Sequence, residues 1–183
     1  MRTMPFTCLV LCSLWSVGCT TGMISTADDP NDEAALGLLR YDGSWVVYPV
    51  ADNAAANISG RVMARQIAGA STQVTLHASG LPANTSFDAH VHKLACNDTQ
   101  AGGHYQNVVS ATATEDNEVW LNLTTDDGGA GEGVAQRPWL IRGGEAKAVV
   151  VHSGVADPVT GKKPKLACLD VPFQLPAVVV GSD

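Results

Sequence analysis

Three of the chain's five histidines lie in one short segment, "FDAHVHKLACNDTQAGGHYQN", which covers residues 87–107. The first two, His90 and His92 in "AHVHK", are two positions apart. Residues i and i+2 of a β-strand point to the same face, so both imidazoles would lie side by side. This spacing predicts a chelating pair, although two histidines on a strand can also be ordinary half-buried polar residues.

Two further histidines extend the pair. His104 follows in "AGGHYQN", where two glycines allow the backbone to bend sharply and bring the imidazole back toward the pair. His152 ends the apolar run "AVVVH" on a separate predicted strand. His77 in "VTLHASG" lies on a strand before the histidine-rich segment and is interpreted as a structural or surface residue. Four neutral imidazoles suit copper or zinc, because calcium and magnesium require clustered oxygen ligands.

The elements that must position these histidines are short strands. Alternating segments such as "ISGRVMARQ", "SFDAHVHKL" and "KAVVVHSG" are separated by turn-forming stretches such as "GLPANTS" and "ADPVTGKKP". The glycine-rich "DDGGAGEG" lacks the Lys-Ser/Thr ending of a phosphate loop and is predicted to be a turn. Seven or eight strands at this spacing predict an all-β domain, an antiparallel sandwich or barrel.

The N-terminal residues 1–18 are typical of a secretory signal. One positive charge at Arg2 and an apolar run too short to span a bilayer precede Cys19. The ending "SVGC" resembles a bacterial lipobox, with Ser16 where that pattern prefers leucine, and an ordinary cleaved signal is the alternative. We therefore expect an exported protein of the bacterial cell envelope, in the periplasm and attached to a membrane only through a lipid at Cys19.

Residues 19–43 follow the signal and are polar and acidic, which predicts a flexible tether. The remaining residues 44–183 are enough for one domain. The whole chain has a net charge of −7, and removal of Arg2 with the signal leaves −8. Such an acidic surface argues against nucleic acid as a partner.

The cysteines can be assigned by counting. Cys8 and Cys12 leave with the signal and Cys19 is the lipidation candidate, so Cys96 and Cys168 remain as the only pair. In an oxidising compartment this count favours a disulfide between them, the alternative being two thiolate metal ligands. The bond would close a loop of about 70 residues, which stabilises a fold by on the order of 4 kcal/mol.

Taken in order, the motifs "HVH", "GGHYQN", "LNLTTDDGGAG", "VVVH" and "KLAC" resemble those of the copper/zinc superoxide dismutases. The resemblance runs from about Ile58 to Phe173 and implies an eight-stranded antiparallel Greek-key barrel. Cys96 and Cys168 fall on the conserved disulfide of that family. The resemblance also implies that copper is the cofactor, with four ligands: His90, His92, His104 and His152.

Two departures from the family pattern resemble its copper-only branch. The segment "YQNVVSATATEDNEVW" after His104, the residue that bridges copper and zinc in the family, contains no histidine, so the zinc site is expected to be absent. The segment "SGVADPVTGKKPKLA" after His152 is much shorter than the family's electrostatic loop, so the copper is expected to be more open to solvent.

Lys165 replaces the arginine that guides superoxide in the family, which keeps the charge but loses the planar fork of donors.

The resemblance implies a copper-dependent superoxide dismutase, which disproportionates superoxide to oxygen and hydrogen peroxide. Lys165 would guide the anion and His104 would be catalytic. The alternative is a non-catalytic copper-binding envelope lipoprotein that buffers or delivers the metal, and the missing arginine favours it.

Supporting residues can be named around this predicted site. The second ring nitrogen of His104 needs a partner in place of zinc, and a nearby carboxylate would fix its tautomer. The candidates are Glu115, Asp116 and Glu118. A local group of cations can attract an anion despite the negative net charge. These cations are Lys93, Lys162, Lys163 and Lys165.

Overall fold

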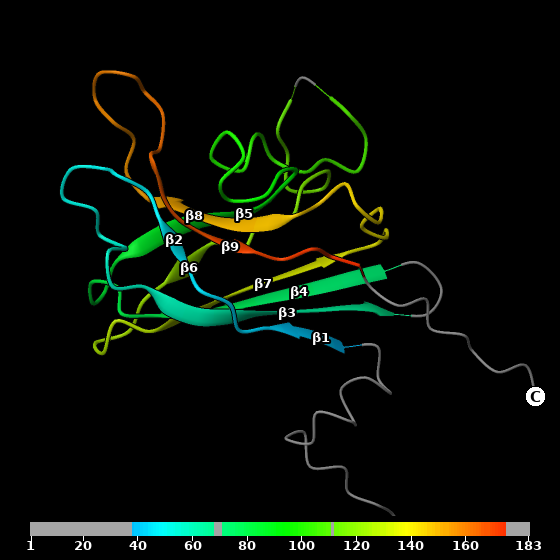
Figure 1. Ribbon diagram of the computed structural model, residues 1–183, viewed down its shortest axis with the longest axis horizontal. Helices are drawn as coiled ribbons and strands as arrows, with labels where there is room; N and C mark the ends of the chain where they lie inside the picture. Colours follow the sequence, from blue (N-terminus) through cyan, green and yellow to red (C-terminus); the bar gives the residue numbers. More distant parts are fainter. Residues whose placement is uncertain (1–37, 68–70, 111, 175–183) are drawn as a thin grey trace, which may run out of the picture.

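A computed structural model describes residues 38–67, 71–110 and 112–174 of the chain (Figure 1). These residues form β-strands and connecting turns but no helix, and therefore no helix that could cross a membrane. The predicted all-β class is confirmed. The predicted signal, Cys19 and the predicted tether up to residue 37 lie outside the described residues.

The first sheet has four strands in the order β1-β3-β4-β7, and each neighbouring pair is antiparallel. Its strands are β1 (Leu38–Tyr41), β3 (Ser59–Ile67), β4 (Ser71–Ser79) and β7 (Gly131–Arg137). Along β4, buried and half-buried residues alternate strictly, as expected for a strand with one face on a core. Val74 and Leu76 are on the buried face.

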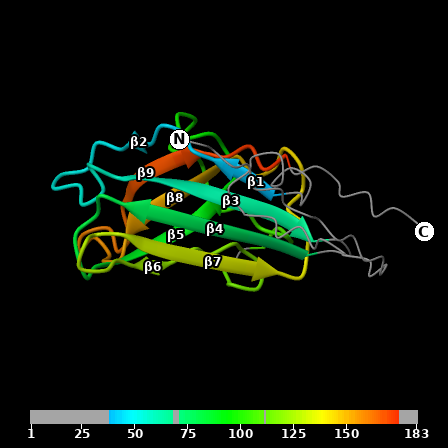
Figure 2. The same ribbon diagram turned by 90° about the horizontal axis from the view of Figure 1, so that it is seen from below.

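The second sheet has five strands in the order β2-β9-β8-β5-β6, again with antiparallel pairs. Its strands are β2 (Val46–Val47), β5 (Ser86–His92), β6 (Leu123–Thr124), β8 (Ala148–Ser153) and β9 (Lys165–Asp170). In Figure 2, strands β3, β4 and β7 lie in front of β9, β8 and β5, so the two sheets stack as a sandwich.

The buried apolar residues form two clusters on opposite sides of the second sheet. The larger cluster fills the space between the sheets and includes Leu76, Phe87, Val91, Val149 and Phe173. The smaller cluster lies on the outer side of the second sheet, and its members are Tyr48, Cys96, Ala101, Ala148, Val150 and Cys168. The predicted disulfide between Cys96 and Cys168 is present here and joins the loop after β5 to β9.

Two strands begin where the sequence predicted other structure. Strand β1 lies inside the predicted tether, because its residues pair with β3 at the edge of the first sheet. Strand β7 begins at Gly131 within the predicted turn "DDGGAGEG". A Cβ atom on Gly133 would lie 2.0 Å from the carbonyl oxygen of Leu121. Glycine is therefore required at this position of β7, where the backbone of Leu121 approaches the strand.

Candidate metal centre

The structure brings the four predicted histidines together. His90 and His92 share the outer face of β5, and His152 lies on the neighbouring strand β8. His104 returns to this face through an isolated bridge with His92. One nitrogen of each imidazole lies within 4.8 Å of the others, so the cluster could hold a metal ion. His77 is on β4 of the other sheet, where it contacts Glu132 at 3.1 Å.

The four rings are arranged as two stacked pairs. The His90 and His104 rings stack with centroids 4.2 Å apart, and the His92 and His152 rings stack at 5.3 Å. The Nε2 atoms of His92 and His152 are only 3.2 Å apart. Such a separation places two lone pairs where a single cation can accept both.

The outward nitrogen of three rings has a defined hydrogen-bond acceptor. Nδ1 of His92 donates to the Gly102 carbonyl at 3.1 Å, and Nδ1 of His152 donates to the Lys163 carbonyl at 3.4 Å. Nδ1 of His104 lies 2.8 Å from Glu118 Oε2. Carbonyl and carboxylate oxygens only accept, so the proton lies on Nδ1 of each ring and Nε2 keeps a free lone pair.

In His90 the nitrogen available to a metal ion is Nδ1, not Nε2 as in the other three imidazoles. Its Nδ1 atom is buried and has no hydrogen-bond partner among the described residues. A buried polar atom without a partner is rare and costly. The free donor set is therefore Nδ1 of His90 with Nε2 of the other three imidazoles, and a metal ion would satisfy the unpaired nitrogen.

Burial keeps these imidazoles neutral. Desolvation, followed by the charge that His104 carries when protonated, lowers the pKa of His90 and of His92 to about 2. The same two causes lower the pKa of His152 to about 4. Only a neutral imidazole binds a metal ion, so three of the four ligands are ready at neutral pH without releasing a proton.

Glu118 is the carboxylate that the structure pairs with His104. Its side chain is almost fully buried and also accepts hydrogen bonds from Trp120 Nε1 at 2.9 Å and Gln106 Nε2 at 3.0 Å. Burial alone would raise the pKa of Glu118, but these hydrogen bonds together outweigh it and hold the pKa below its usual range. Of the other candidates, Glu115 pairs with Arg137 at 3.3 Å.

Sequence reasoning missed two groups at this centre. Trp120 packs edge-on against His90 with ring centroids 5.6 Å apart. The Gly102 carbonyl accepts from His92 and also from Lys165 Nζ, which lies 2.6 Å away. A backbone carbonyl has no sequence signature, whereas Trp120 lies two residues from Glu118 in the alternating segment "NEVWLNLTT", so alternation could have placed the two side chains on one face.

Two of the four predicted cations, Lys163 and Lys165, have specific partners. Lys165 Nζ donates to the carbonyls of Gln100 and Gly102, both at 2.6 Å, which fixes its charge beside His92. Burial lowers its pKa. Lys163 forms an ion pair with Asp88, which lies opposite His152 in the β5–β8 register.

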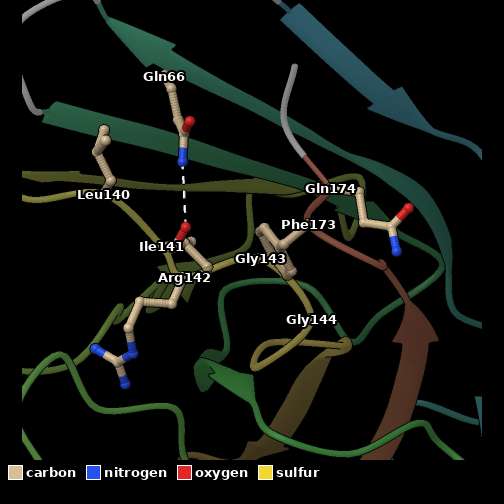
Figure 3. Close-up of a pocket in the computed structure, with 8 residues that line it drawn as sticks. All are labelled: Gln66, Leu140, Ile141, Arg142, Gly143, Gly144, Phe173 and Gln174. Atoms are coloured by element: carbon tan, nitrogen blue, oxygen red, sulfur yellow. Dashed lines mark hydrogen bonds between the residues drawn. The ribbon is translucent and has the colours of Figure 1, made fainter. Parts of the chain in front are cut away.

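One pocket is separate from the histidines. It has a volume of about 640 Å³ and lies beside the Gly143–Gly144 turn (Figure 3). Gln66 lines it and donates to the Ile141 carbonyl at 3.2 Å. None of its lining residues belongs to the histidine cluster, so it offers no substrate cavity for the metal centre.

No protein-family model matches this chain, and a search of curated proteins found no match.

Proposed function

We propose that this chain is a copper-dependent, superoxide dismutase-like protein of the bacterial cell envelope, similar to the copper-only branch of the copper/zinc family. The observation that carries the proposal is the convergence of four imidazole nitrogens on one point of the outer face of β5 and β8. An all-imidazole set suits copper in both of its oxidation states. When bound, copper supplies the one-electron exchange that converts two superoxide anions and two protons to oxygen and hydrogen peroxide.

In this proposal His104 is the ligand that handles a proton. Its side chain is 29% exposed, so it is open to solvent, unlike the other three rings, which are buried. Glu118 holds the proton on Nδ1 and offsets the positive charge that arises when Nε2 takes up a second proton. Nε2 would take up this proton only while it is not bound to a metal ion, and the ring would then pass the proton toward the product.

Lys165 is proposed to guide the anion to the centre. Two backbone carbonyls hold its ammonium group in place next to His92, so the charge has a fixed position. A fixed local cation acts within one Debye length, about 10 Å at 0.1 M salt, and can outweigh a dispersed negative charge at that range.

The finer topology is also a proposal. Strand β7 lies beside β4, and β8 lies beside β5, so the chain crosses between the sheets in the manner of a Greek key. We propose an eight-stranded barrel made of β1 and β3–β9, with the two-residue β2 as an addition. Export, lipidation at Cys19 and the lack of a zinc site belong to the same proposal.

Metal analysis combined with a superoxide-decay assay tests the function. The mature domain should bind one equivalent of copper and no tight zinc. Lys165→Ala should keep its copper but lose several-fold in bimolecular rate, with a weaker dependence on ionic strength. Lys165→Arg should match or exceed the parent. If all three proteins load fully and the parent is no faster than free-buffer controls, the catalytic proposal is wrong.

A second function, non-catalytic copper binding for buffering or delivery, is favoured by one observation. Two of the four predicted cations are already engaged, Lys163 by Asp88 and Lys165 by backbone carbonyls. Engaged cations attract a free anion less strongly. Under this alternative, copper loads fully in the same assay and superoxide decay does not change.

A further inference from the structure

The arm, residues 104–110 and 112–118, carries both His104 and Glu118 but belongs to neither sheet as a regular strand. Isolated bridges join His104 to His92 and Gln106 to Glu118. The exposed residues between them include Val109, which is 87% exposed. Contacts from elsewhere must therefore fix the ends of the arm, where the metal centre needs them.

Side chains of the clasp, residues 137–142 ("RPWLIR"), contact both ends of the arm. Arg137 at the end of β7 donates from Nε to the Glu118 carbonyl at 2.6 Å. Trp139 Nε1 donates to the Asp116 carbonyl at 3.0 Å. Arg142 donates to the carbonyls of Gln106, at 2.9 Å, and Asn107.

Arg142 also packs over the ring of Tyr105, the residue after the ligand His104, at 5.1 Å. In Figure 3 its guanidinium group points away from the other residues that line the pocket. The pocket is therefore not the partner of this charge. The partners of the Arg142 charge are the Glu145 carboxylate, at 2.7 Å, and the carbonyls of the arm.

Arg137 differs from Arg142 in its burial. Arg137 is 8% exposed, whereas the Arg142 side chain is 39% exposed. A buried charge must be fully hydrogen-bonded, and its bonds to buried acceptors are stronger than neutral ones. Each guanidinium nitrogen of Arg137 has one acceptor: the Glu118 carbonyl for Nε, the Gln136 carbonyl for Nη1 and the Glu115 carboxylate for Nη2. The backbone of Glu118 is thus fixed by the first sheet while its side chain orients His104.

We propose that Arg137 is a positioning residue of the metal centre, which acts through Glu118 on the orientation of His104. The inference rests on the proposed metal site but not on superoxide turnover. It assigns the first sheet, which carries no ligand, a direct part in holding the fourth imidazole.

The test compares Arg137→Met, which removes every donor but keeps the apolar stem, with Arg137→Lys, which keeps the charge. Arg65→Met is the matched control, because Arg65 lies on the same sheet and its side chain, on the exposed face, bonds only Gln73 among the described residues, at 2.7 Å. The full mature domain is used, and urea denaturation shows which variants fold. Copper affinity is measured by chelator competition, and long-range ¹H–¹⁵N spectra of the metal-free protein report the protonated nitrogen of His104.

Arg137→Met should lose about tenfold in copper affinity, the lower end for groups that orient a ligand. Its metal-free His104 should exchange between tautomers, whereas the parent holds the proton on Nδ1. The copper affinity of Arg137→Lys should lie between those of Arg137→Met and the parent. Arg65→Met should match the parent in both copper affinity and His104 signals.

The inference is overturned if folded Arg137→Met, or Arg137→Lys where the methionine variant does not fold, matches Arg65→Met in both copper affinity and His104 signals. A parent that binds copper without accelerating superoxide decay removes the catalytic proposal alone. A parent that binds no copper removes the metal site, and the inference with it.

Discussion

Replacing Glu118 with glutamine should weaken copper binding more than any other Glu→Gln or Asp→Asn substitution in this chain. The carboxylate accepts from His104 and Trp120 on Oε2 and from Gln106 on Oε1. An amide has one oxygen and one NH₂ group, so one of these donors would face another donor. Gln106 cannot simply turn its own amide, because its oxygen already accepts from the Ser110 backbone at 3.0 Å.

The size of the effect follows from burial. An unsatisfied buried donor costs about 1–3 kcal/mol, and a hydrogen bond to a charged group contributes about 1.5–3 kcal/mol. Loss of a group that orients a metal-binding histidine typically lowers metal affinity by about 10–100-fold. We therefore expect copper affinity to fall in that range for Glu118→Gln, with a loss of about 1–3 kcal/mol in the unfolding free energy of the metal-free protein.

Chelator competition at neutral pH measures the affinity, and urea denaturation measures the stability. Glu132→Gln is the matched control, because Glu132 also contacts a histidine, His77, at 3.1 Å, but is 52% exposed and lies on the other sheet. If folded Glu118→Gln binds copper as tightly as Glu132→Gln, the carboxylate does not orient His104 and the reasoning fails.

Three further predictions follow from other parts of the structure. Because burial lowers the pKa of His90 and His92 to about 2 and of His152 to about 4, the unfolded chain takes up protons below its ordinary histidine pKa of about 6.5 while the native state does not. Metal-free stability in urea should thus fall as the pH drops from about 6.5 to about 4, by up to about 1.4 kcal/mol per pH unit for each histidine, and a flat profile would contradict this. Replacing both Cys96 and Cys168 with alanine should lower the unfolding free energy by on the order of 4 kcal/mol, since the bond spans 72 residues, and unchanged urea midpoints would refute it. Gly133→Ala should lower the melting temperature, because its Cβ would meet the Leu121 carbonyl at 2.0 Å, whereas Gly143→Ala, with nothing within 4 Å, should leave it unchanged.

The ligand set could be predicted from the sequence because it depends on local rules. Strand alternation places His90 and His92 on one face, and a glycine-rich turn returns His104 to them. The predicted strand of His152 proved to be the neighbour of β5. The disulfide needed only a count of the cysteines and an expected compartment.

Other features depend on contacts between distant segments, which local patterns do not encode. The sequence does not distinguish among three carboxylates as the partner of His104, namely Glu115, Asp116 and Glu118. In the fold, the bridge between Gln106 and Glu118 places Glu118 beside His104, where it is buried. Strand β7 was not predicted to begin at Gly131, because glycines locally favour a turn. In the fold, Gly133 instead permits the backbone of β7 to approach the carbonyl of Leu121 closely. The role of Arg137 likewise requires knowing which carbonyl it reaches.

His90, His92 and His152 point outward from the second sheet, while Ala89, Val91 and Val151 on the same strands point inward to the main core. The histidine cluster and the main core therefore lie on opposite sides of shared strands. Natural selection can exchange, lose or add a ligand on one side without disturbing the packing on the other. We expect descendants of such a chain to keep the sandwich after losing the metal, and the scaffold to be a tolerant host for engineered centres with other donor sets.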